Sequence, residues 1–270
     1  MFRLPTLAII TGLAAICASI LFSSNNPAVF INIPGLAIII GGISTALFFS
    51  YSANDIKTAL NKVRMLFNDV QIDKEQTMKH INNIAQLWSR NDLRGIEDKL
   101  EKLDNRFLQT GIQHVIDRRP NEEIISVLSW KIQQLRNSEY RISRIFHSMA
   151  MFAPAFGMVG TLLGLVNMMF LIDDQSSASI ASHLAIALVT TFYGLVLANL
   201  LFKPIAIKLE RRTDKMIEWM GIMMEGIMMI EQRKSPAFIK QMMTMLDPYQ
   251  QSDISNELAS RQVKPALNAR

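Results

Sequence analysis

Residues 148–172 read SMAMFAPAFGMVGTLLGLVNMMFLI and contain no Asp, Glu, Lys or Arg. A helix needs about 20 mostly apolar residues to cross a hydrocarbon core of about 30 Å, because it rises about 1.5 Å per residue. Residues 180–202, IASHLAIALVTTFYGLVLANLLF, form a second such run after a short polar connection. These two runs predict a helical hairpin that spans a membrane.

Two further apolar runs, Leu4–Phe22 and Val29–Tyr51, are joined by the turn-like residues 23–28 and predict another hairpin. The fold class expected is therefore an all-α integral membrane protein with four transmembrane helices in two hairpins. Arg3 followed by the first run also fits a cleavable signal. The run of 19 residues exceeds the usual ~7–15 of such a signal, so a retained span is favoured.

The charged residues lie outside the hairpins and predict their orientation. Residues 52–147 hold 16 of the 28 Lys and Arg, the tail from 208 holds 10, and the loops 23–28 and 173–179 hold none. Because Lys and Arg concentrate on the cytoplasmic side, both termini are expected in the cytoplasm of a multi-pass membrane protein. Topology thus explains the net charge of +5, and no nucleic acid is expected as a partner.

Four regions follow from this pattern. Residues 1–51 and 148–207 are the two transmembrane hairpins. Residues 52–147 show apolar residues at helical spacing and predict a helical cytoplasmic body between the second and third spans. Residues 208–270 predict a cytoplasmic amphipathic helix that ends in a polar tail.

The chemistry that the chain lacks narrows its function. It has no Walker-type phosphate loop, no dinucleotide fingerprint and no His-Glu-x-x-His motif, and its one cysteine, Cys17, excludes a Cys-based zinc site. We therefore expect neither an enzyme nor a cofactor. None of the four runs contains Asp or Glu, so a pathway for ions would need a carboxylate from another chain.

Small residues and hydroxyls face each other in the last two spans. Thr161 lies 11 residues from Ile172, and Thr191 lies 11 residues from Ile180, so both hydroxyls are expected about 16 Å below the outer ends of their helices. Small residues at spacings of three and four continue along the same helix faces. The spacing fits close packing, as in a Gly-x-x-x-Gly pair, and it also fits a polar ion path. The close-packing residues are Gly157, Gly160, Gly164 and Gly194.

Residues 152–166 (FAPAFGMVGTLLGLV) and 187–194 (ALVTTFYG), together with Pro204, closely resemble the A subunit of bacterial flagellar-motor stators of the MotA/PomA type. Residues 30–34 (FINIP) look like the start of that family's second span. The wider superfamily includes the TolQ/ExbB energisers of outer-membrane systems, which have one span before the cytoplasmic body. The two spans here favour the stator.

The resemblance implies a protein of the bacterial inner membrane that serves motility and chemotaxis and couples inward H⁺ or Na⁺ flow to rotation. It implies a pentamer in the lipid bilayer around two copies of a single-span B subunit (MotB/PomB type), whose Asp binds the ion. It also implies that the cytoplasmic loop contacts a rotor switch-complex protein. The residues that match are Thr161, Thr191 and Thr190 in the ion pathway, Pro154 and Pro204 as hinges, and Arg90, Glu97 and Asp98 as rotor contacts.

The Thr190–Thr191 pair resembles sodium-type members, which slightly favours Na⁺ bound transiently near Thr161 and Thr191. Two other functions remain open from the sequence. One is a TolQ/ExbB-like proton-channel energiser of an outer-membrane system. The other is a non-conducting membrane scaffold whose helical loop recruits partners.

Overall fold

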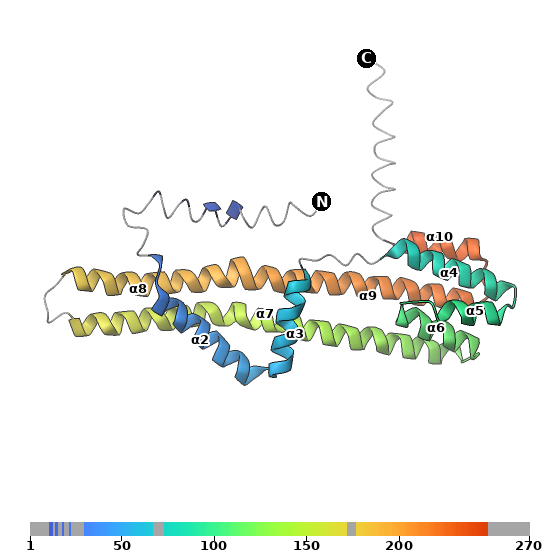
Figure 1. The fold of residues 1–270 in the computed structure, drawn as a ribbon, viewed down its shortest axis with the longest axis horizontal. Coiled ribbons are helices and arrows are strands. Elements are labelled where there is room, and N and C mark those ends of the chain that lie inside the picture. The colour runs from blue at the N-terminus through green and yellow to red at the C-terminus, as the bar shows by residue number, and fades with distance from the viewer. Residues whose placement is uncertain are drawn as a thin grey trace, which may run out of the picture. The chain divides into compact units, whose positions relative to one another are not determined.

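The computed structural model describes residues 30–66, 73–171 and 177–247, with scattered positions between Thr11 and Phe22. The described residues are helical and include no strand. They form two compact units, which we call the span unit (residues 1–68 and 140–210) and the body unit (residues 69–139 and 211–270). Two long helices, α7 (Asn121–Leu171) and α9 (Lys203–Glu231), contribute residues to both units (Figure 1).

The span unit contains α2 (Ile33–Ser50), α3 (Ala53–Leu66), α8 (Ser177–Val196) and the π-helix η3 (Leu197–Phe202), with parts of α7 and α9. Three described helices are long and apolar enough to cross a membrane, with candidate windows in Ile33–Ser50, Asn121–Phe170 and Ala187–Glu231. The second, third and fourth predicted spans are therefore apolar helices. The first predicted span, Leu4–Phe22, lies outside the described residues.

Helix α2 begins where the sequence supplies a cap. The Asn32 side chain accepts a hydrogen bond from the backbone N–H of Gly35 (2.8 Å), and Pro34 stands in the first turn, where its missing N–H costs no helical bond. Residues at every fourth position, such as Ile39 and Ile43, are buried. Phe49 on another face is 90% exposed, as suits a helix surrounded by lipid.

The boundary between the units falls after Asn68, so α3 belongs to the span unit and not to the polar body that the sequence predicts from residue 52. Ala59 and Leu66 of α3 are buried in the same apolar cluster as Ile43 and Leu47 of α2. This burial explains why the span unit extends beyond the apolar run itself.

The π-helix keeps one side of the fourth span against its neighbours. Buried residues recur at steps of four from Thr190 through Gly194, Ala198, Phe202 and Ala206. Four residues turn an α-helix by about 400°, so a regular helix would drift out of contact along such a series. The wider turn of η3 accommodates the extra residue and keeps this face packed.

The body unit contains α4 (Lys74–Ser89), α5 (Leu93–Leu100), α6 (Arg106–Ile116) and α10 (Pro236–Leu246), with the other parts of α7 and α9. Asp73, Asp92, Asn105 and Ser235 cap the starts of α4, α5, α6 and α10. Its core is aliphatic and rich in methionine, including Ile81, Leu108, Met223, Ile227 and Met243.

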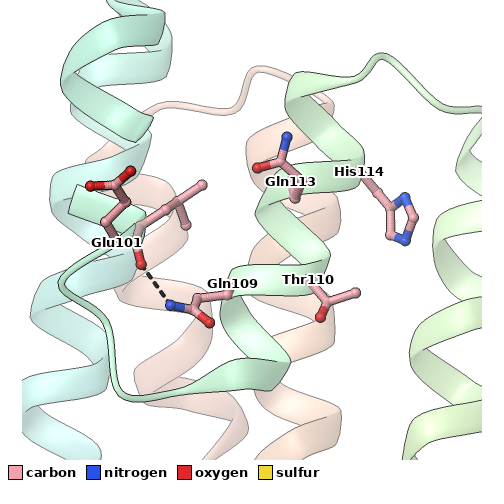
Figure 2. A pocket seen from close by; sticks show the side chains of 6 residues that line it. Glu101, Gln109, Thr110, Gln113 and His114 are labelled. Atoms are coloured by element: carbon pink, nitrogen blue, oxygen red, sulfur yellow. Dashed lines mark hydrogen bonds between the residues drawn. The ribbon is translucent and has the colours of Figure 1, made fainter. Parts of the chain in front are cut away.

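A hollow of about 440 Å³ lies on the body unit, beside α5 and α6 (Figure 2). The amide of Gln109 donates to the carbonyl oxygens of Leu100 (2.7 Å) and Leu103 (2.8 Å). These bonds occupy carbonyl groups at the end of α5. Among the labelled side chains, His114 points away from Glu101. Among the polar groups of this hollow, the Gln109 amide thus pairs the carbonyl groups at and just after the end of α5.

Candidate functional site

The site is built where α7 and α8 approach at backbone distance. A Cβ atom on Gly157 would lie 3.2 Å from the Cα of Thr191, and one on Gly194 would lie 2.6 Å from the carbonyl oxygen of Ala153. A Cβ on Gly164 would lie 2.8 Å from the Cβ of Ala187. Glycine is therefore the residue that this contact accommodates. Figure 1 shows α8 running alongside α7 (Figure 1).

At this contact the structure brings together Thr161 and Thr191. Their Oγ1 atoms lie 2.9 Å apart, and each also reaches the carbonyl oxygen of Gly157, at 3.1 Å and 3.3 Å. The two hydroxyl protons can be donated within this group, which leaves acceptor lone pairs on both oxygens. Both residues are half-buried. The hydroxyl pair can therefore accept a hydrogen bond from a protonated acid or supply oxygen ligands to a small cation.

Thr190 lies on a different face of α8 from this pair. It is fully buried, and its hydroxyl lies 2.5 Å from where a Cβ on Gly35 would stand. A Cβ on Gly160 would collide with the Thr190 methyl group. Thr190 thus fills the space between α2 and α7, and Gly35 and Gly160 make room for it.

A polar contact that the sequence did not predict joins the start of α2 to α8. The Tyr193 hydroxyl donates to the carbonyl oxygen of Phe30 and accepts from the backbone N–H of Asn32 at 3.0 Å. The rings of Phe30 and Phe192 meet edge to face, with centroids 6.4 Å apart. A tyrosine within an apolar run needs a hydrogen-bond partner for its hydroxyl, and this requirement is the sequence feature that could have indicated the contact.

The two predicted hinge prolines occupy different local structures. Pro154 lies inside α7, which continues as a helix to Leu171. Pro204 follows the π-helix directly, and the N–H of Lys203 bonds to the carbonyl oxygen of Ala198, five residues earlier. A proline cannot donate a helical hydrogen bond, so both sites weaken their helices. Both prolines are half-buried.

The predicted rotor contacts lie in the body unit and are exposed. Arg90 ends α4, while Glu97 and Asp98 lie on α5. Among the residues that the structure describes, none of the three forms an ion pair. Their charges are therefore available to a partner.

Within the described parts of the spans that form this site, residues 33–50, 148–171 and 177–202, no carboxylate is present. The described residues also contain no group of three or more His, Cys, Asp or Glu side chains that could hold a metal ion. Neutral hydroxyls do not offset the cost of placing a unit charge in a low-dielectric site as a carboxylate would. The described residues of this site thus supply neutral oxygen ligands for an ion but no negative charge to balance it.

Residues 99–221 match the MotA/TolQ/ExbB proton channel family. The chain is 29% identical over 248 residues to "Motility protein A" of Borreliella burgdorferi, an alignment that covers 92% of this chain and 95% of that protein. It is 31% identical over 207 residues to the uncharacterized protein YtxD of Bacillus subtilis, covering 77% of this chain and 75% of that protein.

Among solved structures, the flagellar MotAB stator complex from Bacillus subtilis contains a chain with a TM-score of 0.82 and 22% identity, over 92% of this chain and 96% of that one. This similarity shows a shared fold. The family match and the relative at 31% identity identify the chain as a member of the MotA/TolQ/ExbB proton channel family.

Proposed function

We propose that this chain is the A subunit of a flagellar-motor stator and couples inward flow of H⁺ or Na⁺ to rotation of the motor. The observation that carries the proposal is the hydroxyl pair of Thr161 and Thr191, 2.9 Å apart in adjacent apolar helices. The similarity to Motility protein A along nearly its whole length supports the same conclusion. The chain acts as an ion-conducting subunit and not as an enzyme.

The missing carboxylate comes from a partner. In this proposal a single-span B subunit places an Asp opposite the hydroxyl pair, and the A subunits form a ring, taken as a pentamer, around two B subunits. The similar solved structure from Bacillus subtilis is a MotAB stator complex, which supports a B subunit as partner. Occupation of the Asp by an ion changes which A subunit it prefers, so successive ions step the ring around the B subunits.

The proposed topology has four spans in the inner membrane, with Leu4–Phe22 as the first and both termini in the cytoplasm. The absence of Lys and Arg from both short loops supports this orientation. The body unit then faces the rotor and presents Arg90, Glu97 and Asp98 to it. Pro154 and Pro204 act as the hinges through which the spans move the body.

The side chains divide into two roles in this mechanism. Thr161 and Thr191 face the ion, whereas the burial of Thr190 against Gly35 and Gly160 supports a packing role for that residue. The glycines at positions 157, 164 and 194 keep the helices close enough for the hydroxyls to meet. A potential of 100 mV supplies about 2.3 kcal/mol per charge, so rotation requires many ion steps.

The test is replacement of Thr191 by Ala in a strain that relies on this chain for swimming. Loss of one hydroxyl from this pair costs about 1–3 kcal/mol, which corresponds to a fall in ion flux of roughly 5-fold to 100-fold and to slower swimming. Thr45→Ala is the matched control, because Thr45 also bonds a helical carbonyl oxygen (Gly41, 2.9 Å) but lies away from the pair. Normal swimming of Thr191→Ala would remove the role of the hydroxyl pair.

A deletion strain separates this function from its relative in the same family. Paralysed cells with an intact outer membrane support the stator, whereas motile cells with an outer-membrane defect support a TolQ/ExbB-like energiser. Swimming in sodium-free and sodium-containing medium then identifies the coupling ion. The sequence-based preference is for Na⁺.

A further inference from the structure

A second polar cluster joins α7 to α9 beyond the hydroxyl pair. One carboxylate oxygen of Glu210, Oε1, accepts a hydrogen bond from the hydroxyl of Ser143 (3.2 Å) and lies 2.9 Å from Nε2 of His147. Ser143 is buried, while the Glu210 and His147 side chains are 29% and 43% exposed. Among the described residues, Oε2 of Glu210 has no hydrogen-bond partner. The cluster is thus anchored on one side and open to water on the other.

This cluster lies on the helix face that also forms the hydroxyl pair. Ser143 precedes Thr161 by 18 residues, which is five turns of about 3.6 residues, so the two side chains share one face of α7. That face contacts Thr191 at one level and Glu210 at the other. His147 and Ser143 lie roughly 21 and 27 Å along the helix from Thr161.

The charges of the span unit make Glu210 unusual. In its described part the acidic side chains are Asp55 and Glu210, whereas seven are Lys or Arg. Asp55 accepts a hydrogen bond from the Ser52 hydroxyl (2.8 Å) at the start of α3. The seven basic residues are Lys57, Lys62 and Arg64 on α3, Arg141 and Arg144 on α7, and Lys203 and Lys208 on α9.

All seven lie just beyond an end of an apolar run in the sequence. In each case it is the end that the predicted topology places opposite the 173–179 connection. Their positive potential raises the free energy of a cation that leaves the membrane on this side. A carboxylate on the helix face that also forms the hydroxyl pair lowers the free energy of the cation locally, because an opposite charge attracts the ion.

We infer that Ser143, His147 and Glu210 form a binding site for the transported monovalent cation as it leaves the membrane. The inference rests on the proposed function, since it takes this end of the spans as the cytoplasmic one. A proton is taken up by the carboxylate–imidazole pair and released to water. A sodium ion is held by the oxygens of Glu210 and Ser143. Tyr51, whose hydroxyl lies 2.8 Å from Oγ of Ser148, lies on the α2 side of the same end.

Glu210→Gln tests the charge alone, because a glutamine oxygen still accepts the bonds from Ser143 and His147. The full chain is expressed with its B subunit, and inward flux is measured with cytoplasmic H⁺ and Na⁺ indicators, per assembled complex. We expect flux of the carried ion to fall about tenfold, and the responding indicator tells H⁺ from Na⁺. Asp55→Asn, the matched control in the same unit, should leave flux unchanged.

A second variant, modified chemically, distinguishes loss of the charge at position 210 from loss of the fold. In a Cys17→Ser background, Glu210→Cys is treated with a negatively or a positively charged thiol reagent. The negative reagent should restore flux and the positive one should not. Unchanged flux in Glu210→Gln, equal loss in Asp55→Asn, or recovery with both reagents would overturn the exit site. A Thr191→Ala variant that conducts normally would instead overturn the proposed function.

Discussion

At the contact between α7 and α8 the side chains are small, and the backbones themselves touch. Gly164 and Gly194 leave no room for a Cβ atom and Gly157 leaves little. The hydroxyls of Thr161 and Thr191 meet at this close contact. The core of the body unit is filled by large, flexible or branched side chains instead, among them Ile227 and Met223. The contact between α7 and α8 thus depends on the missing side chains of the glycines, whereas the core of the body unit depends on large side chains that fill it.

This difference predicts opposite responses to substitution. Adding atoms should damage the contact between the spans, whereas removing atoms should damage the body. Small residues allow helix backbones to approach in lipid, where no hydrophobic gain drives the helices together. In water, by contrast, each buried methylene contributes about 0.8 kcal/mol to stability.

The largest effect is expected for Gly194→Val. A Cβ atom there would lie 2.6 Å from the carbonyl oxygen of Ala153, which is backbone and cannot rotate away. Overpacking in a core that can relax costs about 1–3 kcal/mol. Here the obstacle is backbone, so the two helices must separate, and the whole contact is lost. We expect loss of membrane assembly and of swimming, measured by the amount of detergent-extracted complex and by motility.

The control for that experiment is Gly41→Ala on α2, because a Cβ at Gly41 meets no atom within 4 Å. It should be neutral or stabilise the helix by about 0.5–1 kcal/mol. Wild-type assembly of Gly194→Val would contradict the backbone contact, and failure of Gly41→Ala would show that glycine is needed throughout the spans.

A smaller effect is expected for Ile227→Ala in the body. Ile227 is fully buried, and one of its side-chain atoms lies 2.5 Å from where a Cβ on Gly111 would stand. Truncation removes buried methyl groups and leaves a cavity, which costs about 2–5 kcal/mol of unfolding free energy. Urea denaturation of the purified full chain measures the loss.

Met216→Ala provides the comparison, because Met216 is 42% exposed on the same helix. Its midpoint should stay close to that of the wild type. If both substitutions cost the same, the body is not held by its buried side chains and the contrast with the spans fails.

The sequence predicts the parts of this molecule that depend on periodicity. Apolar runs without charge predict the second, third and fourth spans, and equal distances from the helix ends predict the meeting of Thr161 with Thr191. These predictions hold because helix geometry fixes rise and rotation per residue.

Periodicity does not predict which of two adjacent hydroxyls faces the partner helix. Thr190 and Thr191 differ by about 100° around α8, and the choice depends on Gly35 of α2 and Gly160 of α7. The contact of Ser143 and His147 with Glu210 depends on the π-helix between Thr191 and Glu210. Its wider turn changes which of the following residues face α7. A local irregularity of this kind has no apolar pattern to indicate it.

The smallest effect is expected at the surface of the body unit, where Lys79 bonds Glu75 at 2.6 Å across one turn of α4. The hydrogen bond to Glu75, followed by the attraction between the two charges, raises the pKa of the Lys79 ammonium above its usual 10.5. A raised folded-state pKa stabilises the fold fully below pH 10.5, and the gain is lost as the pH rises through the raised value. Both side chains are exposed, so water screens the pair.

Replacing Lys79 by Gln should therefore leave the melting temperature at pH 7 almost unchanged, in contrast to Ile227→Ala. Any small advantage of the wild type should disappear when melting is followed by circular dichroism at alkaline pH, beyond the raised pKa. Glu75→Gln removes the same pair from the other side and should give the same profile. A large loss at pH 7 in either variant would mean that surface charge, and not the buried side chains, stabilises this unit.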